Sequence, residues 1–215
     1  MMIQRGTPAR ANFTMAWLLM SAIAGLLLLT ALNGARLSAA SGGPAVDVDG
    51  MINPEEYQFH YTDPDIGMEV HWAITDHDLY VGLKAPARGW LGFGLYPGVP
   101  FKVEVMKGAD IYIAYVAEGE VFGEDHFADS PYGHKPDDAL GGAADIAELA
   151  GSEDAGFTTI EFKRALNTLD KFDADVPVRG LVYLAYAEAD NFTAFHTAFT
   201  EAIFNFATGR VEKQE

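Results

Sequence analysis

Hydrophobic and polar residues alternate along most of the chain after residue 57, a period of two that is typical of β-strands. Residues 68–74 and 79–83 both follow this pattern, and the polar string Asp76-His77-Asp78 lies between them. Two alternating runs that are joined by a short polar turn predict a β-hairpin.

Six further segments are rich in Val, Ile, Tyr and Phe and are separated by Gly, Pro and Asp; these are residues 89–96, 109–117, 120–127, 157–163, 180–187 and 202–207. Many short strands with turn signals between them predict an all-β protein built as a sandwich. Residues 130–155 differ, because Pro131, Gly133 and Pro136 break the strand pattern and six acidic residues accumulate there. We expect a long loop in this segment, with a helical turn near residues 144–150.

The first forty residues have a different composition from the rest of the chain. Two arginines precede an uncharged apolar stretch, residues 16–32, and the small residues Ser38-Ala39-Ala40 follow it. This order predicts a signal peptide, residues 1–40, that exports the protein to the periplasm or the extracellular space and is cleaved near Ala40. The apolar stretch also approaches the length of a membrane span, so the alternative is an N-terminal anchor helix that attaches the protein to a membrane.

The remainder of the chain is long enough for one well-buried core and short for two. We expect a linker at residues 41–54, one β-sandwich domain at residues 55–207 and a C-terminal tail at residues 208–215. No internal repeat and no coiled-coil period is visible in the sequence.

Charge and cysteine content exclude several classes of protein. The net charge is −17, and removal of residues 1–40 would take away three arginines and no acids, which leaves −20. Such a domain repels nucleic acid and anionic lipid and attracts basic partners. Because the chain contains no cysteine, disulfides, thiolate metal sites and haem attachment through a C-x-x-C-H motif are all excluded.

Three strings in the chain carry a family resemblance: Gly-Trp-Leu-Gly-Phe-Gly-Leu at 89–95, Met-Lys-Gly-Ala-Asp at 106–110 and Gly-Phe-Thr-Thr-Ile-Glu-Phe-Lys-Arg at 156–164. Together they resemble a DOMON domain, and the resemblance covers roughly residues 50–207. It implies an immunoglobulin-like β-sandwich that binds haem or sugar. The haem-binding branch of that family includes the cytochrome domain of cellobiose dehydrogenase.

In the haem-binding branch, a methionine just before the Gly-Ala-Asp string and a histidine near the end of the domain ligate the iron, and Met106 and His196 match those positions. The resemblance therefore implies a non-covalently held haem b. A Met/His pair raises the reduction potential and fills both axial positions, so we expect an electron-transfer protein without catalytic turnover of its own that serves a redox partner protein. Aromatic residues near these ligands are expected to pack on the haem ring: Trp90, Phe93, Tyr96, Phe101, Phe192, Phe195 and Phe199.

Two alternatives remain at this point, because haem-free DOMON domains share the Gly-Trp and Met-x-Gly-Ala-Asp strings. The first is a haem-free module that binds carbohydrate or another ligand by stacking it on exposed aromatics, with Trp90 and Tyr96 as first candidates. The second is an accessory haem subunit of a larger oxidoreductase, similar to the γ subunit of ethylbenzene-dehydrogenase-type enzymes. There a lysine replaces the imidazole, so Lys102 or Lys107 would compete with His196 for the iron.

The other histidines and acids give weaker signals. His60 and His71 are expected on neighbouring strands, whereas His126 and His134 flank the acidic segment near Asp125 and Asp137. These groups match no closed zinc signature, so surface histidines are the preferred interpretation over a zinc or copper site. The string Asp47-Val-Asp-Gly50 lacks most ligands of a calcium loop and is assigned to a turn.

Overall fold

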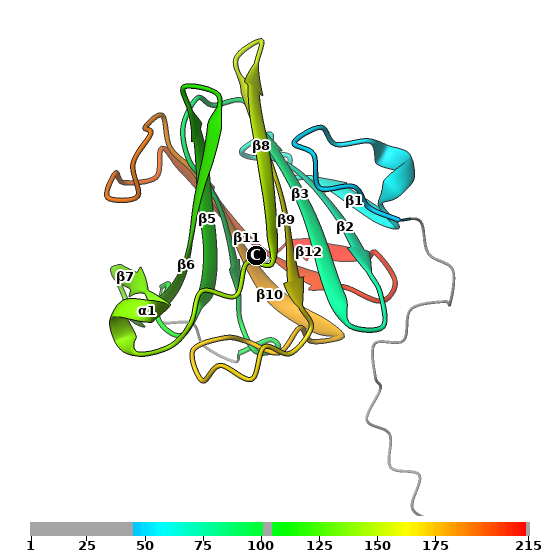
Figure 1. Ribbon diagram of the computed structural model, residues 1–215. Helices are drawn as coiled ribbons and strands as arrows, with labels where there is room; N and C mark the ends of the chain where they lie inside the picture. Colours follow the sequence, from blue (N-terminus) through cyan, green and yellow to red (C-terminus); the bar gives the residue numbers. More distant parts are fainter. Residues whose placement is uncertain (1–44, 101–104, 214–215) are drawn as a thin grey trace, which may run out of the picture. The chain divides into compact units, whose positions relative to one another are not determined.

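The computed structural model describes residues 45–100 and 105–213, and within these ranges the chain forms two antiparallel sheets that pack face to face (Figure 1). The five-stranded sheet has the order β1-β2-β3-β9-β8, with strands Phe59–Thr62, Glu69–Ile74, Asp78–Ala85, Phe157–Ala165 and Glu148–Asp154. The seven-stranded sheet has the order β12-β11-β10-β4-β5-β6-β7, with strands Val211–Lys213, Ala198–Asn205, Arg179–Tyr186, Leu91–Leu95, Asp110–Ala117, Glu120–Ser130 and Gly133–Pro136. A short 3-10 helix, Pro54–Glu56, and one helical turn, α1 at Asp137–Leu140, complete the domain and confirm the predicted all-β sandwich.

The core between the sheets is built by the alternation that the sequence displays. On β4, Leu91, Phe93 and Leu95 point inward and are at most 1% exposed. They meet residues of the five-stranded sheet such as Phe162, whose ring centroid lies 6.0 Å from that of Phe93. The predicted hairpin is formed by β2 and β3, with Trp72 opposite Val81.

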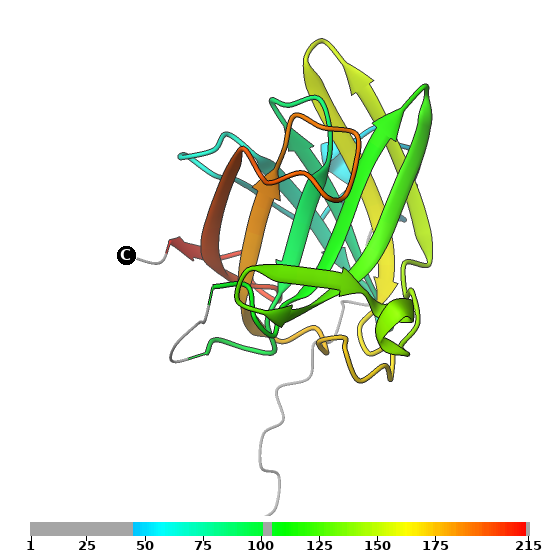
Figure 2. The ribbon, with the colours of Figure 1, turned by 90° about the vertical axis from the view of Figure 1, so that its left-hand side faces the viewer.

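The seven-stranded sheet is apolar on its outer face as well. A second buried cluster, separate from the core between the sheets, includes Trp90, Ile111, Ile113, Leu181 and Tyr183. Figure 2 looks onto this face, where the segment between β10 and β11 and the strand β7 lie in front of the other strands. A sheet that buries both faces needs such a cover on the side that no second sheet protects.

An ion pair joins the two sheets at one end of the sandwich. The Arg164 guanidinium on β9 donates to Asp110 Oδ2 on β5 over 2.8 Å, and both side chains are almost fully buried. Tyr112 donates its hydroxyl to the same oxygen over 3.1 Å, and the guanidinium carbon lies 5.3 Å from the centre of the Tyr112 ring. The buried charges of Arg164 and Asp110 thus neutralise each other across the two sheets.

A second buried acid, Glu161 on β9, holds the entry of the chain into the domain. Glu161 accepts hydrogen bonds from the Gly50 backbone N–H over 2.8 Å and from the Tyr57 hydroxyl over 2.6 Å. Because Ile160 and Phe162 point into the core, Glu161 points to the outer face of the five-stranded sheet. The segment that begins near Asp49 is therefore fixed on that face, and its backbone forms the turn that the sequence predicted, with Asp49 Oδ1 accepting from the Met51 N–H.

The expectation of one long loop at residues 130–155 was wrong. This segment contains β7, α1 and the edge strand β8, and its helical turn lies at residues 137–140 rather than 144–150. Gly, Pro and acidic residues lower β-propensity but are tolerated in strands that pair on one side only, as β7 does with β6 and β8 does with β9. The short terminal strand β12, which pairs with β11 alone, was also not predicted.

The expected leader, residues 1–40, lies outside the described residues, as do Phe101 and Lys102. Within the part of the chain that is described, no helix has both the length and the apolar character needed to cross a membrane.

The strand β12 at residues 211–213 is expected to stabilise the domain through Lys213. Its ammonium lies 2.8 Å from Asp63 Oδ2, and the Asp63 carboxylate is fully buried. Burial acts to raise the pKa of Asp63, yet the bond from Lys213 and two backbone N–H groups outweigh it and leave the pKa below its usual value. Lys213→Met should therefore lower the free energy of unfolding by about 2 kcal/mol, measured by urea denaturation.

Lys135→Met provides the control for this prediction. Lys135 pairs with Asp129 over 2.5 Å, but both groups are solvent-accessible. Loss of such an exposed pair typically costs at most about 1 kcal/mol. Equal losses in the free energy of unfolding for the two substitutions would show that the buried Asp63 carboxylate is not stabilised by Lys213.

Candidate functional site

A cavity of about 520 Å³ opens on the outer face of the seven-stranded sheet. We call it the outer-face pocket. Its floor is made by outward-facing residues of β4, β5 and β10, and its walls by β6, β7 and two connecting segments. The floor residues are Gly92, Gly94, Ile111, Ile113, Tyr183 and Ala185; the wall residues include Trp90, Val105, Met106, Glu124, His126, Tyr132, His134, Pro136 and residues 192–196.

The pocket is deep over β4 because two of the outward positions of that strand are glycines. Gly92 and Gly94 alternate with the inward residues Leu91, Phe93 and Leu95. A Cβ atom at Gly94 would lie 3.1 Å from the Tyr183 Cβ, and one at Gly92 would lie 3.3 Å from the Trp90 ring. The depression therefore exists because the string Gly-Trp-Leu-Gly-Phe-Gly-Leu places no side chain there.

Met106 and His196 both line this pocket although 90 positions separate them in the sequence. Met106 lies in the turn before β5, where its carbonyl accepts from the Ala109 N–H over 2.9 Å. His196 lies just before β11, where the next residue, Thr197, donates its N–H to the Tyr186 carbonyl over 2.7 Å.

The register of the sheet places these two residues at opposite ends of the pocket. Asp110, at the start of β5, is opposite Leu95 on β4, whereas Tyr186, at the end of β10, is opposite Leu91. Met106 therefore approaches from the Leu95 end of β4 and His196 from the Leu91 end. The glycine floor lies between them.

His196 carries a nitrogen suited to metal coordination. Its ring is partly buried, with the edge of Phe199 at a centroid distance of 4.8 Å. Burial lowers the pKa of His196 below its ordinary value, so the imidazole is neutral near pH 7 and keeps a free lone pair.

The aromatic residues predicted to surround a haem are distributed unevenly. Trp90, Phe192 and Phe195 line the pocket. Phe93 points into the core between the sheets, and Tyr96 is buried beside the pocket, where its hydroxyl donates to the Val105 carbonyl over 2.5 Å. The remaining described candidate, Phe199, lies next to His196 and stacks on Tyr183 at a centroid distance of 5.6 Å, and Phe101 is outside the described residues.

Sequence reasoning did not place three polar residues of the wall in this pocket: Glu124, His126 and His134. The two Nδ1 atoms of the histidines are 2.6 Å apart, and His126 Nε2 lies 2.6 Å from Glu124 Oε2. At this distance one imidazole must donate a proton to the other, so the pair is neutral or shares one charge. The alternation of β6 could have indicated this placement, since Glu124 and His126 share a face and Asp125 points to the other.

His60 and His71 pair across β1 and β2, as predicted, with stacked rings 5.9 Å apart. They lie on the outer face of the five-stranded sheet, so the structure does not bring them to the pocket.

Comparisons with known proteins agree with this architecture. A model of the DOMON domain family matches residues 65–189, which is more than half of the chain. Among curated proteins, "MOXD1 homolog 2" of Drosophila melanogaster is 27% identical over 111 residues, which are 52% of this chain and 14% of that protein. The chain therefore spans only a small part of this relative.

Two solved structures of cytochrome domains are similar to the chain. The cytochrome b domain of pyranose dehydrogenase from Coprinopsis cinerea aligns with a TM-score of 0.51 and 10% identity, over 70% of this chain and 83% of that chain. The cytochrome domain of Myriococcum thermophilum cellobiose dehydrogenase aligns with a TM-score of 0.36 and 14% identity, over 73% and 81%. The first likeness shows a shared fold, and the second is too distant to support a conclusion.

The paired histidines predict a dependence of stability on pH. Burial, followed by the neighbouring His126, lowers the pKa of His134 to about 4, and burial also lowers the pKa of His126. Because these groups titrate near 6.5 in the unfolded chain, their stabilisation is complete above that pH and is lost as the pH falls towards 4. Between about pH 7 and pH 5, we expect the free energy of unfolding to fall by about 2 kcal/mol more in the wild type than in His134→Phe.

The exposed His77 supplies the matched control for this measurement. His77→Phe should retain the pH dependence of the wild type in urea denaturation at each pH. If His134→Phe retains it as well, the two ring nitrogens do not form a neutral pair in the folded protein.

Proposed function

The chain belongs to the DOMON domain family, and on this basis we propose that its outer-face pocket binds haem b without a covalent bond and that the domain transfers electrons. The observation that carries the proposal is that Met106 and His196 line one cavity from opposite ends. A thioether and a neutral imidazole are a common axial pair for iron in electron-transfer cytochromes.

The pocket is suited to a flat, mostly apolar ligand. Its volume lies within the range of about 300–1,000 Å³ that is usual for cofactor sites. Ile111 and Ile113 supply apolar surface on the floor, and the glycines of β4 leave it open. The buried Trp90 Nε1 has no hydrogen-bond partner among the described residues.

Each side chain has a distinct part in this proposal. Met106 and His196 would hold the iron, and Trp90, Phe192 and Phe195 would exclude water from the ring. Haem held by these two residues would supply one-electron chemistry. Phe195 and Tyr132 are 86% and 80% exposed, so the rim near them is where a redox partner would approach.

The predicted leader and the net charge of −17 fit an exported domain that exchanges electrons with a basic partner protein. Export and the partner remain part of the proposal.

A haem-free carbohydrate module is less well supported by the geometry. The candidate stacking residues Trp90 and Tyr96 are only 5% and 3% exposed, so neither offers a free ring face to a sugar. Ligation by Lys107 is also less well supported than ligation by His196, because Lys107 is exposed and is not among the residues that line the pocket.

Spectroscopy of ligand variants tests the assignment directly. Protein produced with haem available should show a sharp reduced α-band and a haemochrome of the b type. His196→Ala should leave the iron high-spin or lose the haem, because a strong nitrogen ligand is removed. Met106→His should retain low-spin haem and lower its potential by on the order of 100 mV, because a second imidazole favours ferric iron.

His77→Ala, on the surface turn between β2 and β3, serves as the control and should leave the spectrum unchanged. A folded protein that stays colourless after haem supplementation would exclude the proposal. An unchanged spectrum in His196→Ala, together with a lost spectrum in Lys107→Ala or Lys102→Ala, would replace His196 by lysine and favour the accessory-subunit alternative.

Filling the floor of the pocket tests the location of the site independently of the ligands. Gly92→Leu would place an apolar side chain where the ring of the cofactor is proposed to lie, and Trp90 must shift slightly to admit it. We expect haem content to fall well below that of the wild type, while the free energy of unfolding falls by only about 1–2 kcal/mol. Thr159→Leu adds a similar side chain on the outer face of the five-stranded sheet and should retain haem. Full haem content in Gly92→Leu would mean that the cofactor lies elsewhere.

A further inference from the structure

We propose that a group of carboxylates at one end of the sandwich, on the opposite side of β5 and β6 from the outer-face pocket, binds a structural calcium ion. We call this group the carboxylate cluster; it comprises Asp110, Asp125, Asp137, Asp145, Asp170 and Asp173. The proposal is independent of haem.

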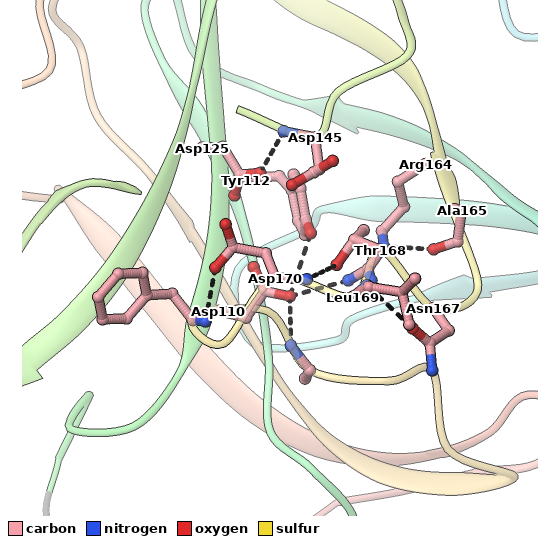
Figure 3. Close-up of polar contacts among 12 residues, drawn as sticks. Asp110, Tyr112, Asp125, Asp145, Arg164, Ala165, Asn167, Thr168, Leu169 and Asp170 are labelled. Carbon is pink, nitrogen blue, oxygen red and sulfur yellow. Dashed lines mark hydrogen bonds and ion pairs between the residues drawn. The ribbon is translucent and has the colours of Figure 1, made fainter. Parts of the chain in front are cut away.

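Distant parts of the chain converge in the carboxylate cluster. One oxygen each from Asp110, Asp125 and Asp173 lie within 4.8 Å of one another. The same holds for Asp137, Asp170 and Asp173, so Asp173 joins two overlapping groups. They come from β5, β6, α1 and the segment between β9 and β10, and Figure 3 shows several of them around Arg164.

Buried oxygens without a partner point to a ligand at this place. Asp137 is 1% exposed, and neither of its carboxylate oxygens has a hydrogen-bond partner among the described residues. Asp110 and Asp125, at 1% and 2% exposure, each leave Oδ1 without a partner. Buried polar atoms in native proteins are nearly always satisfied, so these oxygens require a cation, water or protons.

The second carboxylate oxygens of Asp110 and Asp125 are held by hydrogen bonds. Asp110 Oδ2 accepts from Arg164 over 2.8 Å and from the Ala174 N–H over 3.0 Å. Asp125 Oδ2 accepts from the Asp145 N–H over 2.8 Å. Asp110 and Asp125 are thus each oriented by one oxygen and present the second, which is how carboxylates that bind a metal are commonly fixed.

The charge balance also calls for a cation. In the described part of the chain, one ion pair reaches the carboxylate cluster, from Arg164 to Asp110. A divalent cation would offset the repulsion among the remaining carboxylates, which a single guanidinium does not balance.

The donor set selects calcium among common divalent ions. Apart from Arg164 Nη2, the unpaired buried atoms at this place are carboxylate oxygens, and Ca²⁺ accepts roughly six to eight oxygen ligands in flexible geometry. Zinc prefers nitrogen or sulfur ligands, and His126 points to the other face of β6. Magnesium retains much of its hydration shell, which a cluster of buried carboxylates does not accommodate as well.

The test compares the melting temperature of the purified full chain in EGTA with that after addition of CaCl₂, together with calorimetric titration. Calcium at about a hundredfold excess over its Kd should raise the melting temperature by roughly 5–10 °C. Asp137→Asn should lose most of this shift and should melt in EGTA at the same or a higher temperature, because one repelling charge is removed. A role confined to folding would instead lower the melting temperature equally with and without calcium.

Two control variants separate this site from general attraction of cations to an acidic protein. Asp138 is the exposed neighbour of Asp137, and Asp49 belongs to the turn that superficially resembles a calcium loop. Asp138→Asn and Asp49→Asn should both keep the calcium response. If Asp137→Asn does not fold, Asp173→Asn takes its place, since Asp173 joins both groups of the cluster.

The proposal is wrong if the wild type shows no calcium-dependent shift, if magnesium at the same concentration gives an equal shift, or if Asp138→Asn abolishes the shift as fully as Asp137→Asn does. Because haem-free protein is expected to respond equally, loss of haem binding would not affect this result.

Discussion

The pair between Asp110 and Arg164 is the interaction on which the arrangement of both sites depends. It fixes Asp110 on the inner face of β5, at the level of Arg164 on the opposite sheet. Since side chains alternate along a strand, Ile111 and Ile113 must then point outward to the floor of the outer-face pocket. A shift of β5 by one residue would exchange its faces, bury isoleucines among the carboxylates and bring Asp110 to the pocket. The pair therefore sets the register for two sites at once.

The order of strands explains how residues far apart in sequence meet over β4. Because β4 lies between β10 and β5, the segments that follow β10 and precede β5 can reach over its two glycines from opposite ends. The pocket thus needs no insertion into the sandwich, only a strand without outward side chains between two neighbours that carry them.

Sequence reasoning succeeded where the physical signal is local. The alternation in the central strands predicted most of them, whereas β7 and β8 depend on hydrogen bonds from one neighbouring strand and have compositions that indicate a loop.

Met106 and His196 were selected by resemblance to a family, and their ligation of iron remains a prediction. Alternation along β4 was readable, but the sequence could not tell which face is inner, so Phe93 was grouped with residues that line the pocket. The carboxylate cluster was not recognised, because Asp110 and Asp173 meet only through the tertiary fold.

The hydrogen bond from Gly50 to Glu161 fixes the side of the sandwich on which the chain enters the domain. The chain enters the domain on the outer face of the five-stranded sheet, and the outer-face pocket opens on the far side of the sandwich. The N-terminal end of the described domain and the outer-face pocket therefore lie on opposite sides of the sandwich. If the domain were held at its N-terminal side, the pocket rim near Phe195 and Tyr132 would face away from the point of attachment and towards the solvent.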